Sequence, residues 1–111
     1  MNIYDTANKL AQEIKSSEEY VNYKMAKQAL NLNTELKTQM QEFEKKRYEV
    51  QIKSIQLGTR NEQEEKEIED LYLKLIENEE AKKYFEAETK FNIVIADVNK
   101  IIGDAIKDVI K

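Results

Sequence analysis

The chain has no proline, and its only glycines are Gly58 and Gly103. Proline breaks helices more strongly than any other residue, so a helix in this chain can end only where a side chain caps it or a glycine turns the backbone. Residues that favour helix, such as Lys, Glu, Gln, Leu and Ala, are abundant. We therefore predict an all-α fold, with a helix content far above the value of about one third that is usual in globular proteins.

The composition excludes many kinds of active site. The 111 residues include no cysteine and no histidine. Thiol nucleophiles, disulfides and Ser-His pairs are therefore impossible, and the usual zinc and di-iron sites are excluded as well. Two glycines cannot form a nucleotide-binding glycine loop. We expect a protein that is not an enzyme, with no catalytic residue, no cofactor and no metal ligand.

Length and hydropathy indicate one small domain without a membrane segment. A chain of 111 residues has too little apolar surface for two separate cores, so we expect residues 1–111 to form a single helical domain. The longest uncharged apolar stretch runs only from Phe91 to Ala96, whereas a membrane-spanning helix needs about 20 residues. Asp5 and Lys9 interrupt the N-terminus before the apolar region of a secretory signal could form. We expect a cytoplasmic protein.

Capping signals divide the N-terminal half into three predicted helices. Apolar residues at spacings of three and four predict the first helix over residues 3–14. Ser16 and Glu19 have the spacing of a capping box, which predicts the start of a second helix. Asn33 is placed to cap a third helix, and Gly58 is placed to end it in the left-handed conformation.

The C-terminal half is divided in the same way. Thr59 and Glu62 have the spacing of another capping box, at the start of a fourth helix. Asn78 is placed to cap a fifth helix over residues 79–110, with a length of about 48 Å. The predicted fold is an antiparallel bundle of four or five helices, dominated by two long helices with coiled-coil-like packing.

Each long helix carries a seam of residues spaced alternately by four and three. The third helix has Leu36, Met40, Phe43, Arg47, Val50, Ser54 and Leu57, and the last has Tyr84, Glu88, Phe91, Ile95, Val98, Ile102, Ala105 and Val109. Arg47 and Glu88 place charges where apolar residues are expected, and such charges must pair or reach solvent. An Arg47–Glu88 ion pair that fixes the helix register is one hypothesis, and separate extension into solvent is the other.

The last helix is too apolar to have a single partner. From residue 93 to residue 98 every side chain except Asp97 is apolar. A surface helix in a monomer shows one apolar stripe, and monomers rarely leave a second one uncovered. We therefore predict a homo-oligomer, with a twofold dimer favoured, through the interface residues Val94, Ile95, Val98, Ile101, Ile102 and Ile106. The alternative is a monomer in which the shorter helices cover the last helix on both sides.

Charged runs and tyrosines suggest weaker alternatives. The acids of residues 62–70 would suit a hard cation, as in a carboxylate- or metal-dependent hydrolase, but acids at a helix start usually face solvent. The run Lys45-Lys46-Arg47-Tyr48 would suit an RNA-binding helical module. Neighbouring glutamates and a net charge of −4 argue against direct nucleic-acid binding. Most of the six tyrosines are expected to be half-buried core residues.

The order of these features is similar to that of a known family. It runs through Ser17-Glu18-Glu19-Tyr20-x-x-Tyr23, Asn33, Phe43, Gln51, Gly58, Leu71, Asn78, Tyr84, Ala87-Glu88 and Ile101-Ile102. This order resembles the YlbF/YmcA family of small helical bacterial proteins, especially its YheA-like members. The resemblance implies a cytoplasmic protein that self-associates and acts through protein partners. It also implies a role in competence, sporulation, biofilm control or the direction of ribonuclease Y. The iron–sulfur clusters of some members are excluded here, because the chain has no cysteine.

Overall fold

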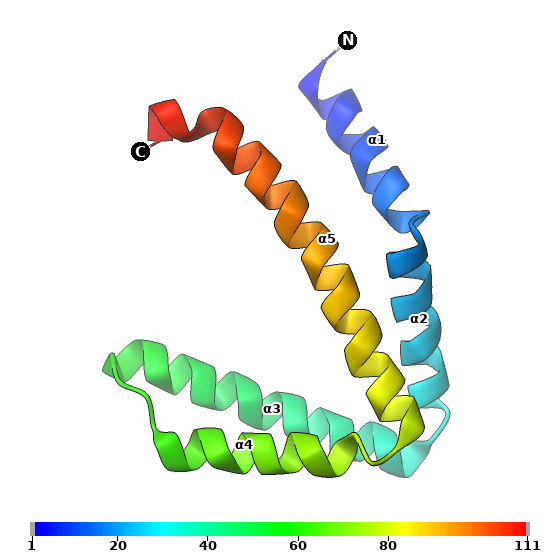
Figure 1. The fold of residues 1–111 in the computed structure, drawn as a ribbon, viewed down its shortest axis with the longest axis vertical. Helices are drawn as coiled ribbons and strands as arrows, with labels where there is room; N and C mark the ends of the chain where they lie inside the picture. Colours follow the sequence, from blue (N-terminus) through cyan, green and yellow to red (C-terminus); the bar gives the residue numbers. More distant parts are fainter. Residues whose placement is uncertain (1, 111) are drawn as a thin grey trace. The chain divides into compact units, whose positions relative to one another are not determined.

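The computed structural model of the protein describes residues 2–110, and these residues form five helices joined by short turns (Figure 1). The helices are α1 (Ile3–Lys15), α2 (Glu18–Asn31), α3 (Thr34–Leu57), α4 (Glu62–Leu75) and α5 (Glu79–Ile110). The prediction of an all-α helical bundle is confirmed. The described residues also confirm the predicted number of helices, and α5 has the predicted bounds.

Three of the predicted helix boundaries are set by the expected residues. The side-chain oxygen of Asn33 accepts the Leu36 amide at 3.1 Å and begins α3. Asn78 accepts the Glu80 amide at 2.8 Å and begins α5. Gly58 ends α3 with φ 69°, in the left-handed region that favours glycine. These predictions are confirmed.

Both predicted capping boxes are wrong. Ser17, rather than Ser16, caps α2, since its hydroxyl oxygen accepts the Tyr20 amide at 3.2 Å. Ser16 is unsuitable because it ends α1 in the right-handed helical conformation (φ −90°, ψ −7°), whereas a cap typically has extended backbone. Asn61, rather than Thr59, caps α4 from an extended conformation. The turn that follows α3 occupies the intervening residues, and Asn is a stronger cap than Thr.

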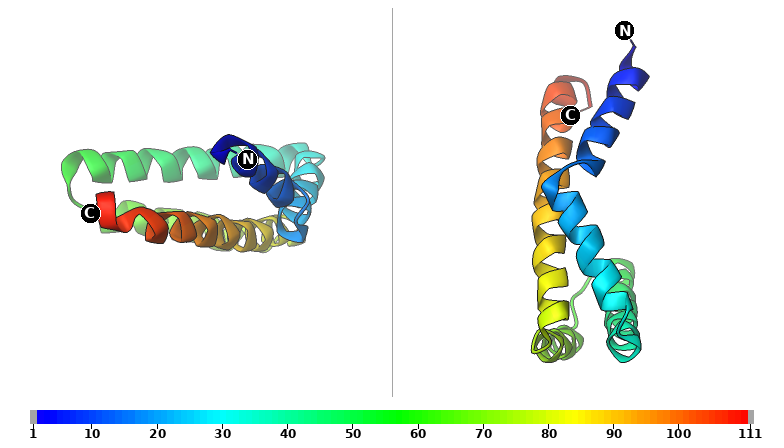
Figure 2. Two further views of the ribbon diagram at one scale, coloured as in Figure 1. Left: turned by 90° about the horizontal axis from the view of Figure 1, so that it is seen from above. Right: turned by 90° about the vertical axis from the view of Figure 1, so that its right-hand side faces the viewer.

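The chain divides into two compact units, which we call the hairpin unit (residues 27–84) and the terminal unit (residues 1–26 and 85–111). In the hairpin unit, α3 and α4 lie side by side and antiparallel (Figures 1 and 2). The buried apolar side chains of this unit are Leu30, Leu36, Met40, Phe43, Val50, Leu75, Ala81 and Tyr84. The apolar residues of the α3 seam are thus buried as far as Val50, whereas Arg47 and, at the end of the helix, Leu57 are exposed.

In the terminal unit, α1 and the first part of α2 follow one side of α5. The rings of Tyr20 and Tyr23 pack on Phe91, with centroid distances of 5.8 and 5.5 Å. Toward the two chain ends, α1 and α5 draw apart, as Figures 1 and 2 both show. Among the described residues of this unit, Phe85 is the one large apolar side chain that is buried. The terminal unit therefore has contacts near the middle of α5 but little core of its own.

Candidate interaction surfaces

The six predicted interface residues all lie on α5, but the structure separates them into two groups. Val94, Ile95 and Val98 are half-buried within the terminal unit. Ile101, Ile102 and Ile106 are 70%, 50% and 44% exposed. The apolar exposure continues to the end of the helix, where Val109 and Ile110 are 82% and 69% exposed. The C-terminal half of α5 thus presents a continuous series of uncovered apolar side chains.

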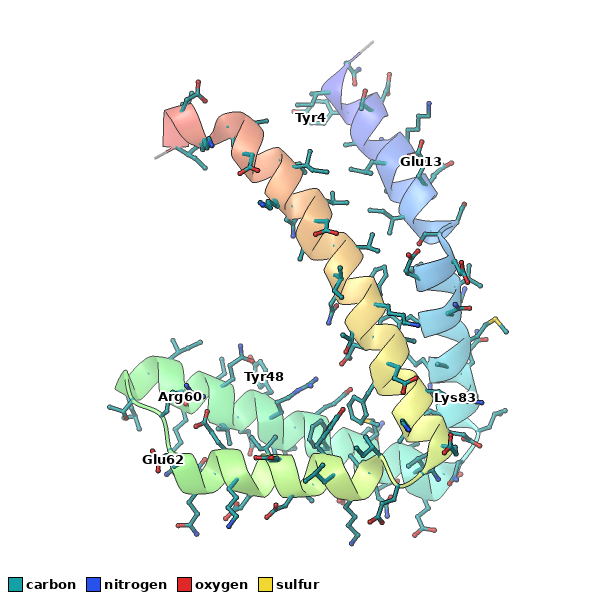
Figure 3. The ribbon with its side chains drawn as sticks, in the orientation of Figure 1. Tyr4, Glu13, Tyr48, Arg60, Glu62 and Lys83 are labelled. Atoms are coloured by element: carbon teal, nitrogen blue, oxygen red, sulfur yellow. The ribbon has the colours of Figure 1, made fainter. Side chains whose placement is uncertain are left out.

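The N-terminal turn of α1 is equally uncovered. Ile3 and Tyr4 are 76% and 75% exposed, although Leu10 and Ile14 further along the same helix are half-buried. Figure 3 shows Tyr4 on the side of α1 that faces α5, and Glu13 on the opposite side. The predicted interface residues did not include any residue of α1, although the apolar residues of α1 recur at the same spacing of three and four. We call the exposed apolar residues at this end of the terminal unit the open-end surface: Ile3, Tyr4, Ile101, Ile102, Ile106, Val109 and Ile110.

The seam charge on α5 is held inside the terminal unit. The Tyr23 hydroxyl donates a hydrogen bond of 3.2 Å to the Glu88 carboxylate. The same tyrosine ring packs on Phe91, so its hydroxyl and its ring both tie α2 to α5. Tyr20 and Tyr23 are half-buried, as expected for tyrosines that combine an apolar body with a polar tip.

The seam charge on α3 is held in the hairpin unit in a different way. The Arg47 guanidinium lies over the Phe43 ring, 5.3 Å from its centroid, which is a favourable cation–π distance. Arg47 lines an open groove of about 660 Å³ between α3 and α4, together with Val50, Ile68 and Tyr72. Each of the two seam charges therefore has a partner within its own unit, and neither depends on the hypothesised ion pair between them.

The acidic run at the start of α4 pairs with bases of α3 and of the turn that follows it. The ion pairs are Lys46–Glu67, Lys53–Glu64 and Arg60–Glu65, with N···O distances of 2.9, 2.9 and 2.7 Å. The hydrogen bond from Lys46 to Glu67 raises the pKa of the ammonium, and Glu65 raises the pKa of Arg60 in the same way. All three pairs are partly or largely exposed, so each stabilises the hairpin only weakly. Among the described residues, no three acidic side chains gather as they would around a metal ion.

The same contacts change the interpretation of the basic run on α3. Lys46 is engaged by Glu67, and Arg47 is directed onto Phe43. Tyr48 is exposed on the side of α3 that faces away from α4 (Figure 3). The run therefore does not present one coherent positive face, which an RNA-binding surface requires.

A comparison with known proteins decides the family. The family described as control of competence regulator ComK, YlbF/YmcA, matches residues 3–107. The chain belongs to the YlbF/YmcA family. This confirms the resemblance that the order of sequence features indicated.

The curated relatives of this YlbF/YmcA chain are UPF0342 proteins of bacteria. One from Desulfitobacterium hafniense (strain Y51) is 37% identical, with 99% of this chain and 89% of the relative covered. One from Halothermothrix orenii is 32% identical over 92% of this chain and 86% of the relative. One from Symbiobacterium thermophilum is 33% identical, with 94% of this chain and 93% of the relative covered. The similarity thus extends over nearly the whole of each chain.

The family is known for regulation rather than for catalysis, and its UPF0342 relatives carry no name of an enzyme. Among the described residues, no helix combines the length and the apolarity that a membrane span needs.

Proposed function

We propose that this chain is a non-enzymatic interaction protein that works as a twofold homodimer. As an adaptor it brings protein partners together in the bacterial regulation of RNA processing or development. The observation that carries the proposal is the uncovered apolar series on the C-terminal half of α5. The family is described by the control of another protein, the competence regulator ComK. This description supports an action through protein contacts.

The free energy available from α5 is of the size that association needs. Its five exposed apolar side chains, from Ile101 to Ile110, leave uncovered the equivalent of about three whole side chains. Burial of one such side chain contributes about 1.5–3 kcal/mol, so two copies together gain roughly 9–18 kcal/mol. Association costs about 4–15 kcal/mol in lost translational and rotational freedom. The two ranges overlap, so the gain is of the same size as the cost.

The contacts of the basic run favour a protein partner over RNA. Two cations of this run are already engaged, because Lys46 binds Glu67 and Arg47 lies over the ring of Phe43. The acidic net charge of −4 further disfavours a polyanion. Contacts with a protein partner do not require a positive net charge, so a protein partner suits this chain better than RNA does.

Light scattering after size exclusion at micromolar concentration tests the dimer. We expect a mass of twice 13.1 kDa for the unaltered chain. The substitution Ile101→Glu should lower the mass toward one chain while helical circular dichroism persists, because a carboxylate would enter an apolar contact without a partner. Lys100→Glu is the matched control, since it adds a carboxylate one residue away, at an exposed position on the polar face of α5. A single 13.1 kDa species for the unaltered chain would contradict the proposal.

A further inference from the structure

The groove between α3 and α4 of the hairpin unit has an apolar lining that the two helices do not cover completely. Phe43 and Val50 of α3 are buried beneath it, whereas Ile68 and Tyr72 of α4 are half-buried along it. Toward the end of α3, Ile55 also lines the groove and is 71% exposed. The groove has a volume of about 660 Å³ and is open to solvent. The hairpin unit therefore leaves part of its own apolar seam in contact with water.

Four charged residues line the same groove, and they divide into one ion pair and two single charges. Arg60 and Glu65 neutralise each other at 2.7 Å. Arg47 on α3 and Glu69 on α4 are exposed, and in the described part of the chain neither of them has an ion-pair partner. The Arg47 guanidinium lies over the Phe43 ring, and a stacked guanidinium keeps the N–H donors at its edge for an acceptor. The groove thus presents a cation on α3 and an anion on α4.

Both sides of the groove follow the spacing by which a helix contacts neighbouring helices. Groove residues recur at spacings of four and three on α3 and of three and four on α4: Phe43, Arg47, Val50 and Ser54, and Glu65, Ile68 and Tyr72. The stretch of α3 from residue 43 to residue 54 has a length of about 16 Å, or three helical turns. Two such stripes side by side provide a site for a third helix of about the same length.

We propose that this groove binds an amphipathic helix of a protein partner, with a carboxylate of that helix on Arg47 and a basic side chain on Glu69. The bound helix inserts apolar side chains at spacings of three and four between α3 and α4. This inference rests on the proposed function, because it assigns to the adaptor a surface for a protein partner. The surface is separate from the apolar series on α5 that the proposed dimer uses.

The open shape of the groove favours a helix over a small molecule. A small-molecule site typically buries roughly 70–90% of the surface of its ligand, which requires an enclosed cavity. An amphipathic helix needs cover on its apolar face only, and its polar face remains in water. The single charges add selectivity, because a helix with acids on one flank and bases on the other matches Arg47 and Glu69 in one direction only.

A synthetic amphipathic peptide tests the groove. The peptide has about 12 residues, with leucines at spacings of three and four, glutamates along one flank and lysines along the other. Titration of the isotope-labelled protein, followed by NMR, should give saturable shifts of groove amides such as those of Ser54 and Tyr72. Arg47→Gln should raise the dissociation constant about tenfold or more, because a charged hydrogen bond beside an apolar surface is lost. Lys45→Gln is the matched control, since it removes the same charge from an exposed position of α3 that does not line the groove.

The direction of the bound peptide provides an independent reading. A spin label at the N-terminus of the peptide should broaden the amides at one end of the groove only. In the double variant Arg47→Glu/Glu69→Lys the preferred flanks are exchanged, so the peptide should bind in the reverse direction and the broadening should move to the other end. Broadening at the same end in both proteins would overturn the assigned roles of Arg47 and Glu69.

The remaining outcomes separate this inference from the proposed dimer. Absence of saturable binding, or an unchanged dissociation constant for Arg47→Gln, would overturn the helix site. Shifts of the groove amides with decanoate but not with the peptide would identify a small amphiphile as the occupant instead. A lower light-scattering mass of Arg47→Gln without peptide would identify a second copy instead. A dimer that does not bind the peptide would overturn this inference alone, whereas a monomer that binds it would overturn only the dimer.

Discussion

Replacing Gly58 by alanine should destabilise the protein by about 1 kcal/mol. Gly58 ends α3 with φ 69°, a conformation that costs an L-residue with a Cβ atom about 1–2 kcal/mol. A Cβ built at this position meets no atom within 4 Å, so no steric clash adds to the cost. Alanine also lowers the conformational entropy of the unfolded chain, which stabilises the folded protein by about 0.4–1 kcal/mol. The net effect of about 1 kcal/mol is therefore the cost of the left-handed backbone less this gain from the unfolded chain.

Gly103→Ala is the matched control for this prediction, because it makes the same chemical change inside a helix. Gly103 lies within α5 and has no positive φ, and its Cβ would likewise meet no atom within 4 Å. Alanine favours the helix interior over glycine by about 1 kcal/mol, so this variant should be more stable than the unaltered chain. The two variants should thus differ by about 2 kcal/mol, with opposite signs relative to the parent.

Urea melts followed by circular dichroism at one protein concentration measure both effects, and thermal melts should show shifts of roughly 4 °C per kcal/mol. If Gly58→Ala raised the stability, α3 would continue past residue 57 and the left-handed turn would be wrong. If Gly103→Ala lowered the stability, another segment would have to pack closely against that face of α5.

Two further substitutions test local contacts by the same melts. Asn61→Ala should cost about 1 kcal/mol by removing the cap of α4, whereas Thr59→Ala should be neutral; the reverse order would restore the capping box that the spacing indicated. Tyr23→Phe should cost about 1 kcal/mol by removing the hydrogen bond to Glu88, and the exposed Tyr4→Phe serves as its control. Equal stabilities of the two phenylalanine variants would show that the hydroxyl of Tyr23 contributes nothing.

The helices could be predicted from the sequence because their signals are local. Without proline, the caps alone set the boundaries, and Asn33, Gly58 and Asn78 each act within one turn of their own position. The cap of α2 was placed one residue too early because Ser16 and Ser17 are chemically identical. The end of the preceding helix decides between them, since Ser16 still has right-handed helical backbone and the Ser17 hydroxyl accepts the Tyr20 amide. That the two units form one domain stays a prediction.

The partners of the seam charges could not be predicted because each charge has more than one possible neighbour. The position of Arg47 on the seam shows that its charge needs a partner, but an arginine can bind a carboxylate or lie over an aromatic ring. The structure gives it the ring of Phe43, one turn earlier on the same helix. Glu88 receives the hydroxyl of Tyr23, which lies 65 residues away along the chain. The sequence contained both partners but no signal that assigns them.

The cover of the apolar faces of α1 and α5 could not be predicted from periodicity alone. An apolar stripe predicts that a helix face will be covered, but it does not say whether the cover comes from the same chain. On α1, Ile14 is half-buried whereas Tyr4 is exposed, and on α5, Val98 is half-buried whereas Val109 is exposed. Tyr4 and Val109 lie toward the end of the terminal unit where the two helices separate (Figure 1). The sequence therefore could not show which apolar side chains of these two helices would have no cover within the terminal unit.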